Sequence, residues 1–270
     1  MDNGDTLEAR IAAYANTAAH NDALFAEFAG LTDTVPCLEQ HRDWVESNRW
    51  GFGERAFHYA WWLLLADLGR RFGTVNALEI GVHSGQLVSL WGVVGRALEI
   101  DTHITAMSPF EGNIKPQPKW MKSLRKRLDP VYRRQKAVGN LHPHDDYLGR
   151  TRHIFAAFDL DFAEVRVIRG YSQDPAVANQ VAGETFELLC IDGDHSLDAV
   201  RSDIAIYAPM VPSGGYLVLD DAGFDVEGGS FWKGFETVSE AARDIPALGF
   251  DNVLNIAHAR VFRRQQAMTI

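Results

Sequence analysis

Acidic and imidazole side chains directly follow two of the apolar runs in this sequence. The runs are LLCI and GYLVL, and the residues after them are Asp192, Asp194 and His195 in the first case and Asp220 and Asp221 in the second. Crowded carboxylates repel one another unless a cation neutralises them, and oxygen ligands favour hard divalent cations such as Mg²⁺, Mn²⁺ or Ca²⁺. We therefore predict a metal site at Asp192, Asp220 and Asp221. The alternative is that these aspartates cap helices and turns.

A third stretch, LEIGVHSGQ, carries Glu79, Gly81 and Gly85 in the order E-x-G-x-x-x-G. Glycines let a backbone turn sharply and approach a ligand, and a helix that follows offers its N-terminal amides. His83 and Gln86 stand where the G-x-G-x-x-G dinucleotide fingerprint has its second and third glycines, so the stretch departs from that motif. It indicates either a ligand-binding turn or a strand-to-helix turn that needs glycine for packing alone.

The elements that must position these residues are short apolar runs separated by amphipathic stretches. The runs lie at 77–80, 103–107, 165–168, 186–191 and 215–220. This alternation predicts an α/β fold with a doubly wound, Rossmann-like and mostly parallel sheet, in which 198–211 forms a crossover helix. Ligands bind at the carboxyl ends of the strands in such sheets. All three polar stretches are therefore expected at one active-site edge.

Two further parts of the chain flank this core. Apolar residues at helical spacing in 6–30 and 54–72 predict a helical N-terminal region over 1–72, followed by the α/β domain over 73–270 with an insertion at 110–160. Four of the seven tryptophans fall in the N-terminal region, so it must bury a surface against the main domain or another subunit. A homo-oligomer formed through this region is one expectation.

Charge and composition narrow the function classes. The net charge of -10 disfavours nucleic-acid binding, although 115–136 holds nine Lys or Arg and one acid, which indicates a solvated helical face, a lid or an anion-attracting rim. No membrane span or signal peptide is evident, so the expected location is the cytoplasm. The two cysteines, Cys37 and Cys190, suggest neither a disulfide framework nor a thiolate metal site.

The stretches LEIGVHSGQ, IDGDHSLDAVRSDI and GGYLVLDDAG, in this order, resemble class I S-adenosylmethionine-dependent methyltransferases, particularly the metal-dependent O-methyltransferases of antibiotic tailoring. The resemblance covers about 75–222. It implies that S-adenosylmethionine is held by the first motif, here Glu79, Gly81, Ser84 and Gly85. It also implies that Asp192, Asp220 and Asp221 bind Mg²⁺ or another hard divalent cation, and that the general base is Asp194 or His195.

The second strand departs from the pattern of that family. Many class I methyltransferases end this strand with an acid that holds the ribose, whereas Met107 and Ser108 stand here, with Glu111 further on. Ribose recognition by Ser108 or Glu111 is therefore one interpretation. After the third strand, Tyr171 and Ser172 lie where the adenine is usually met, although an ordinary loop also explains them.

The expected activity is transfer of a methyl group to a hydroxyl of a sugar, a phenol or another natural product. An alcohol is a poor nucleophile, so a metal that lowers its pKa and a nearby base would both help. His195 is preferred to Asp194 as this base because imidazole titrates near neutral pH. Two alternatives stay open: a hydroxylase-like enzyme, since the motifs also resemble proteins named cephalosporin hydroxylases, and a non-catalytic nucleotide-binding module.

Overall fold

A seven-stranded sheet in the order β3-β2-β1-β4-β5-β7-β6 forms the centre of the computed structural model, which describes residues 6–115 and 117–266. The strands are β1 (Thr74–Ile80), β2 (Asp101–Ser108), β3 (Arg166–Arg169), β4 (Leu188–Ile191), β5 (Tyr216–Leu219), β6 (Phe250–Ile256) and β7 (Ala259–Arg264). Strands β1 to β5 run parallel, and β7 is antiparallel to both of its neighbours. The predicted doubly wound α/β fold is confirmed. The β6–β7 hairpin was not predicted from the sequence. Residues 1–5, part of the stretch considered for a signal peptide, lie outside the described residues.

Both faces of the sheet are buried. In β4, Leu188 and Cys190 join one apolar cluster, whereas the alternating residues Leu189 and Ile191 join a second cluster. A strand buried on both faces reads as a continuous apolar run, which is why the sequence pattern located these strands. The strand order reverses between β1 and β4, so the carboxyl ends of these two strands border the crevice where such sheets bind ligands.

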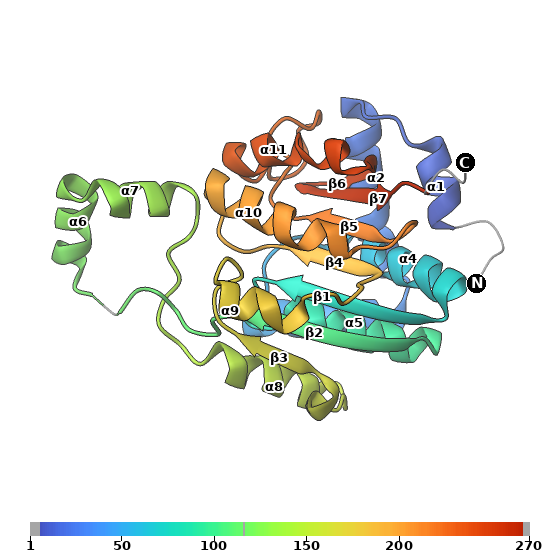
Figure 1. Ribbon diagram of the computed structural model, residues 1–270, viewed down its shortest axis with the longest axis horizontal. Helices are drawn as coiled ribbons and strands as arrows, with labels where there is room; N and C mark the ends of the chain where they lie inside the picture. The colour runs from blue at the N-terminus through green and yellow to red at the C-terminus, as the bar shows by residue number, and fades with distance from the viewer. Residues whose placement is uncertain (1–5, 116, 267–270) are drawn as a thin grey trace.

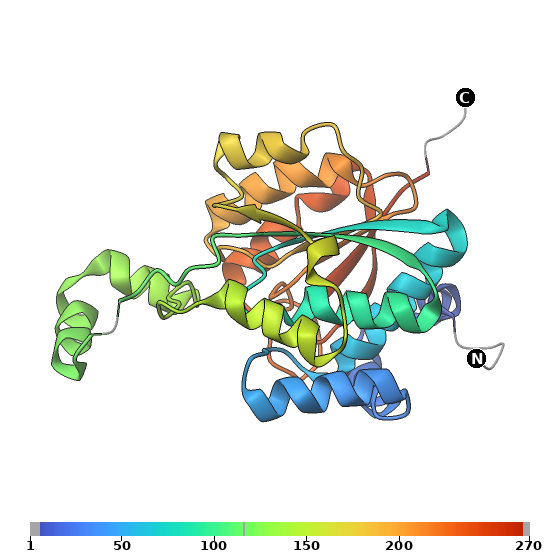
Figure 2. The same cartoon turned by 90° about the horizontal axis from the view of Figure 1, so that it is seen from below.

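Helices cover the sheet in two layers, which Figures 1 and 2 show from two directions. The α-helices of the described residues, of which α6 and α7 do not contact the sheet, are α1 (Leu7–Ala13), α2 (Ala18–Thr32), α3 (Pro36–Asn48), α4 (Arg55–Phe72), α5 (Gln86–Leu98), α6 (Lys119–Leu128), α7 (Pro130–Ala137), α8 (Tyr147–Ala157), α9 (Pro175–Ala178), α10 (Leu197–Tyr207) and α11 (Glu236–Ala242). The predicted crossover helix is α10, which ends in a 3₁₀ turn at Ala208–Met210. Within the described part of the chain, no helix is both long and apolar enough to span a bilayer.

The N-terminal helices bury their apolar faces against the rest of the same chain. Phe28 of α2 meets Tyr59 of α4 edge-on at 5.2 Å between ring centroids, and Trp61 meets Trp91 of α5 at 5.4 Å. The N-terminal region was expected to pack either against the main domain or against another subunit, and the structure shows packing against the main domain. The division of the chain into domains at residue 72 stays a prediction, because these contacts join both parts in one apolar cluster.

The expected insertion between β2 and β3 has two unlike parts. Helices α6 and α7 project away from the body, whereas α8 returns to it and lies beside α5 (Figures 1 and 2). Between them, residues 138–146 run along the edge of the sheet where the polar residues gather.

Candidate active site

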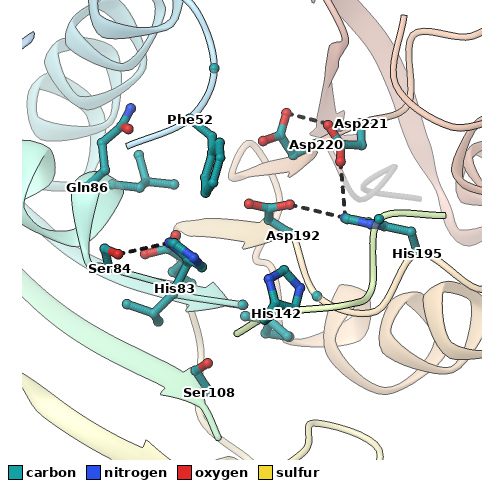
Figure 3. A pocket seen from close by; sticks show the side chains of 18 of the residues that line it. Phe52, His83, Ser84, Gln86, Ser108, His142, Asp192, His195, Asp220 and Asp221 are labelled. Carbon is teal, nitrogen blue, oxygen red and sulfur yellow. Dashed lines mark hydrogen bonds and ion pairs between the residues drawn. The ribbon is translucent and has the colours of Figure 1, made fainter. Parts of the chain in front are cut away.

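The predicted site residues gather around one cavity of about 670 Å³ at the carboxyl ends of β1, β2, β4 and β5 (Figure 3). Those that line it are Glu79, Gly81, Ser84, Ser108, Tyr171, Ser172, Asp192, Asp194, His195, Asp220 and Asp221. Gly85 is the exception: it is the N-cap of α5 and does not line the cavity. A volume of this size lies within the range of cofactor and small-molecule sites.

At position 81, in the turn after β1, glycine is required for two reasons. Its φ of 99° lies in the region that side chains rarely adopt, and a Cβ there would lie 1.9 Å from the carbonyl oxygen of Asp192. Gly85, with φ of 89°, faces Thr151 of α8, whose Cγ2 would lie 2.4 Å from a Cβ. The turn after β1 therefore contacts the backbone at the end of β4 directly.

We expect Gly81→Ala to destabilise the protein by roughly 2 to 4 kcal/mol, because it adds both backbone strain and a clash with Asp192. Gly183→Ala is the matched control: Gly183 has φ of 81° and nothing within 4 Å of an added Cβ, so it carries the strain alone. Urea unfolding of both variants measures the difference. Equal losses of stability would show that the contact with Asp192 is unimportant.

Glu79 lines the cavity and is buried. Burial raises its pKa well above the usual range, and the charge of Asp192 adds to this effect. Among the described residues, its Oε2 atom has no hydrogen-bond partner. A buried acceptor of this kind is costly unless a donor satisfies it, so a bound ligand that carries hydroxyl or amino hydrogens suits this position.

The other predicted cofactor residues differ in their exposure and in the hydrogen bonds that they make within the protein. Ser84 Oγ lies 3.0 Å from His83 Nδ1, and Ser172 Oγ accepts a hydrogen bond from Gln173 Nε2 at 2.8 Å. Ser108, at the end of β2, is buried, whereas Tyr171 is 61% exposed at the rim. The hydroxyl groups of Ser84 and Ser172 therefore already have protein partners.

His83 lines the cavity but was not predicted from the sequence as a site residue. Its φ of 44° places it in the left-handed region, and its ring lies 4.5 Å from that of Tyr147 and 5.8 Å from that of His142. Burial, and then the neighbouring His142, lower the pKa of His83 to about 4. His83 is therefore a neutral imidazole at physiological pH.

Three carboxyl groups line the cavity where β4 and β5 end, those of Asp192, Asp220 and Asp221 (Figure 3), although in the described residues these three do not by themselves form a group with all ligand atoms within 4.8 Å. Burial and the charge of Asp220 raise the pKa of Asp192 well above its usual range, although 34% of this side chain is accessible, so solvent offsets part of the effect. Burial, and then the charges of Asp220 and Asp192, raise the pKa of Asp221 to about 9 against the opposing effect of His195. Ionisation of all three carboxyl groups is therefore unfavourable in the absence of a cation, and a bound cation would stabilise their charged forms.

His195 presents one ring nitrogen to these carboxylates. Its Nδ1 lies 2.7 Å from the carbonyl oxygen of Val138, and because a carbonyl only accepts, Nδ1 carries the proton. Its Nε2 lies 3.1 Å from Asp221 Oδ2 and 3.6 Å from Asp192 Oδ1 (Figure 3). The ring stacks on Phe235 at 4.7 Å. Nε2 is thus the atom of His195 that can accept a proton or bind a cation.

Asp194, the other candidate base, is engaged in local structure. Its Oδ1 accepts hydrogen bonds from Asn140 Nδ2 at 2.8 Å and from the backbone N–H of Ser196 at 2.7 Å. Asn140 Oδ1 in turn accepts from the backbone N–H of His195 at 2.9 Å. Asn140, which the sequence analysis missed, is buried and ties the insertion to both candidates. This geometry favours His195 over Asp194 as the group that faces the carboxylates.

His258, in the turn between β6 and β7, is a second imidazole that the sequence analysis missed. Its Nε2 lies 3.3 Å from Asp220 Oδ1 and 3.5 Å from Asp221 Oδ1, and the side chain is almost fully buried. In the described residues, two groups that could hold a metal ion each have their ligand atoms within 4.8 Å: Asp192, His195 and Asp221, and Asp220, Asp221 and His258. Asp221 belongs to both groups, and the donor set is not all oxygen.

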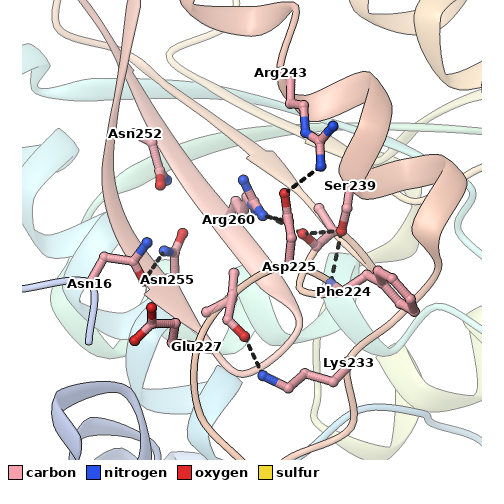
Figure 4. A network of polar contacts seen from close by, with 12 residues as sticks. Asn16, Phe224, Asp225, Glu227, Lys233, Ser239, Arg243, Asn252, Asn255 and Arg260 are labelled. Atoms are coloured by element: carbon pink, nitrogen blue, oxygen red, sulfur yellow. Dashed lines mark hydrogen bonds and ion pairs between the residues drawn. The ribbon is translucent and has the colours of Figure 1, made fainter. Parts of the chain in front are cut away.

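A polar network holds the loop that follows Asp221 (Figure 4). Arg260 Nε and Ser239 Oγ each donate a hydrogen bond of 2.7 Å to the carbonyl oxygen of Ala222. The Arg260 guanidinium also pairs with Asp225. These contacts fix the backbone next to Asp221, whose φ of 56° is itself left-handed.

The segment that carries these motifs matches a known family. Residues 78–222, more than half of the chain, match the family described as a methyltransferase domain. The chain belongs to this methyltransferase family. The matched segment begins in β1, contains the Gly81 turn and ends just after Asp220 and Asp221. It therefore spans the site residues of the three motifs on which the resemblance was based.

Solved structures share the fold of this methyltransferase. The O-methyltransferase NovP superposes with a TM-score of 0.56 at 17% identity, over 77% of this chain and 79% of that chain. A candidate caffeoyl-CoA O-methyltransferase from Staphylococcus aureus gives 0.51 at 18% identity, over 83% and 91% of the two chains. Cofactor-bound Rv0187 from MTB gives 0.51 at 15% identity, over 88% and 96%. No curated protein sequence matches the chain. The predicted class I methyltransferase fold is confirmed.

Proposed function

We propose that this methyltransferase moves the methyl group of S-adenosylmethionine to a hydroxyl of a small molecule, such as a sugar, a phenol or another natural product, with Mg²⁺ or another hard divalent cation. The observation that supports this proposal is that the glycine turn after β1 and the carboxylate–histidine cluster share one cavity. In-line transfer requires the methyl donor and the activated hydroxyl to lie next to each other.

For the cofactor, we assign the methionine and ribose parts to the turn after β1 and the end of β2. Glu79 offers the ligand a buried carboxyl oxygen that has no protein partner among the described residues, and the Gly81 turn allows close approach of the backbone. Ser108, at the end of β2, is our candidate for a ribose contact. Tyr171, exposed at the rim, and the buried Ser172 are our candidates for contacts with the adenine.

The donor set fits a divalent cation. Asp192, Asp220 and Asp221 would hold it, and the raised pKa values of Asp192 and Asp221 reflect burial and mutual repulsion of the ionised groups, which a cation would offset. His258 adds a nitrogen donor beside them, which is compatible with Mn²⁺ as well as Mg²⁺. When bound, the cation would lower the pKa of the acceptor hydroxyl.

In the proposed reaction, His195 Nε2 takes the proton of the acceptor hydroxyl. The hydroxyl oxygen forms a bond to the methyl carbon while the bond from that carbon to the sulfur breaks, and S-adenosylhomocysteine leaves. The hydrogen bond from Nδ1 to the Val138 carbonyl supports this role because it keeps Nε2 as the acceptor. Asn140 positions His195 through the backbone, and Asp194 helps to hold Asn140.

Isothermal titration of S-adenosylmethionine and S-adenosylhomocysteine, with and without Mg²⁺, tests the proposal. We expect the wild type to bind the nucleotide and the cation, and a triple variant with Asp192→Ala, Asp220→Ala and Asp221→Ala to lose the cation. No nucleotide binding under any metal condition would contradict methyl transfer. Product mass then separates the alternatives: methylation adds a methyl unit, a hydroxylase adds an oxygen, and a binding module gives no product.

A further inference from the structure

Helices α6 and α7, here called the arm (residues 119–137), stand apart from the rest of the molecule (Figures 1 and 2). α6 has no buried residue, and Tyr132 is the buried residue of α7. The described residues of 115–138 do not line the active-site cavity. In this conformation the arm is therefore neither part of the core nor a lid over the site.

The arm nevertheless has a defined shape of its own. Asp129, between its two helices, accepts a hydrogen bond from the backbone N–H of Tyr132 at 2.9 Å and forms an ion pair with Arg125 at 3.2 Å. The Arg125 guanidinium lies over the Tyr132 ring, 4.5 Å from its centroid. These contacts fix the angle between α6 and α7, so the arm presents a preformed surface.

That surface includes an apolar stripe that nothing in the described chain covers. Trp120, Leu124 and Leu128 are 65%, 48% and 66% exposed, and Val131, at the start of α7, is 57% exposed. The three residues of α6 are spaced four apart, so they lie on one face of the helix. Contiguous exposed apolar side chains on a soluble element mark an interaction surface.

Charge identifies the kind of partner. Nine basic residues and one acid give 115–136 a formal charge of +8, which leaves -18 for the rest of the chain against the total of -10. A cationic surface of this kind is steered towards an anionic one. The body of a second copy of this chain is anionic, and it also exposes apolar side chains, among them Phe52, Tyr171 and Trp232 around the cavity mouth.

We propose that the arm is a dimerisation element that docks on the acidic body of a second copy, whose own arm docks in return. Reciprocal docking is a closed, two-fold arrangement, the commonest one among homo-oligomers. The arm leads directly into Val138 and Asn140, which hold His195, so docking would also fix the segment that orients this residue. The inference does not depend on the methyltransferase chemistry.

Light scattering after size-exclusion chromatography of the full chain, at micromolar concentration and at low and high salt, tests this proposal. We expect a wild-type dimer that weakens at high salt, because the attraction between arm and body is screened. A triple variant with Trp120→Ser, Leu124→Ser and Leu128→Ser, and a double variant with Lys122→Glu and Lys126→Glu, are each expected to raise the dimer Kd by at least about 100-fold.

Leu248→Ser is the matched control, because Leu248 is an exposed apolar residue outside the arm, and this variant should stay dimeric. Circular dichroism of each variant checks that the fold is retained. A monomeric wild type, or a dimer that both arm variants leave intact, would overturn the proposal. Cosedimentation of a monomeric wild type with vesicles of phosphatidylglycerol and phosphatidylcholine, lost in the arm variants, would overturn it in favour of a membrane surface.

Discussion

Replacement of Asp221 by asparagine is expected to lower the affinity for Mn²⁺ by at least about 100-fold while it makes the metal-free protein more stable. Asp221 is the residue shared by the two groups that could hold a metal ion, with Oδ2 towards His195 and Oδ1 towards His258. The same carboxylate lies beside two other acids, and an amide removes that repulsion. We expect a gain of about 1 to 3 kcal/mol in the free energy of unfolding at pH 8.

The pH dependence of stability gives the same prediction a second readout. Asp221 has an ordinary pKa of 3.8 and a folded pKa of about 9, so the folded chain binds this proton more tightly than the unfolded chain does. Its contribution to stability is therefore present in full below about pH 4 and falls as the pH rises towards about 9. The metal-free wild type should lose stability over this range more steeply than Asp221→Asn.

Manganese titration followed by electron paramagnetic resonance, and urea unfolding at several pH values, measure these effects. Asp198→Asn is the matched control, since Asp198 is an exposed aspartate in the first turn of α10, outside the cluster. It should leave both the Mn²⁺ affinity and the pH dependence unchanged. An Asp221→Asn variant that binds Mn²⁺ within threefold of the wild type would show that the cluster is not a cation site.

The carboxylates could be predicted from the sequence because each follows a buried strand. The runs that end at Ile191 and Leu219 are apolar on both faces, and parallel neighbours in a sheet end at the same edge. Position after a strand was therefore enough to bring Asp192, Asp220 and Asp221 to one cavity. The glycine turn was found by the same reasoning, one strand away.

Two other site residues could not be predicted from their position after a strand: Asn140, which holds His195, and His258, the second histidine beside the carboxyl groups. His258 comes from a hairpin whose strands join the sheet antiparallel, and Asn140 comes from an insertion between β2 and β3. Each reaches the site through tertiary contacts that leave no local spacing pattern. Helix α3 lies within the region predicted to be helical, but its own spacing was not identified, because its buried face includes His41 and Arg42 and so lacks a continuous apolar stripe.

A His195→Ala variant is expected to lower kcat for methyl transfer by about 100- to 10,000-fold, the usual contribution of a general base, while the Kd of S-adenosylmethionine stays within about threefold. The reason is geometric: Nε2 of His195 faces the carboxylate cluster, whereas Oδ1 of Asp194 is occupied by Asn140 and Ser196. The assay uses a hydroxylated acceptor that the wild type methylates, and it follows formation of S-adenosylhomocysteine.

Asp194→Asn provides the comparison that separates the two candidate bases. An asparagine side chain keeps an oxygen for the Ser196 N–H, so this variant should lose much less kcat than His195→Ala if Asp194 has only a structural role. The pH–rate profile distinguishes a lost base from a displaced one: removal of the base should abolish the rise in kcat with pH, whereas a misplaced His195 would retain it. A large loss in Asp194→Asn together with near-normal turnover in His195→Ala would assign the base to Asp194, and His195 would then act through its contacts with Asp192 and Asp221.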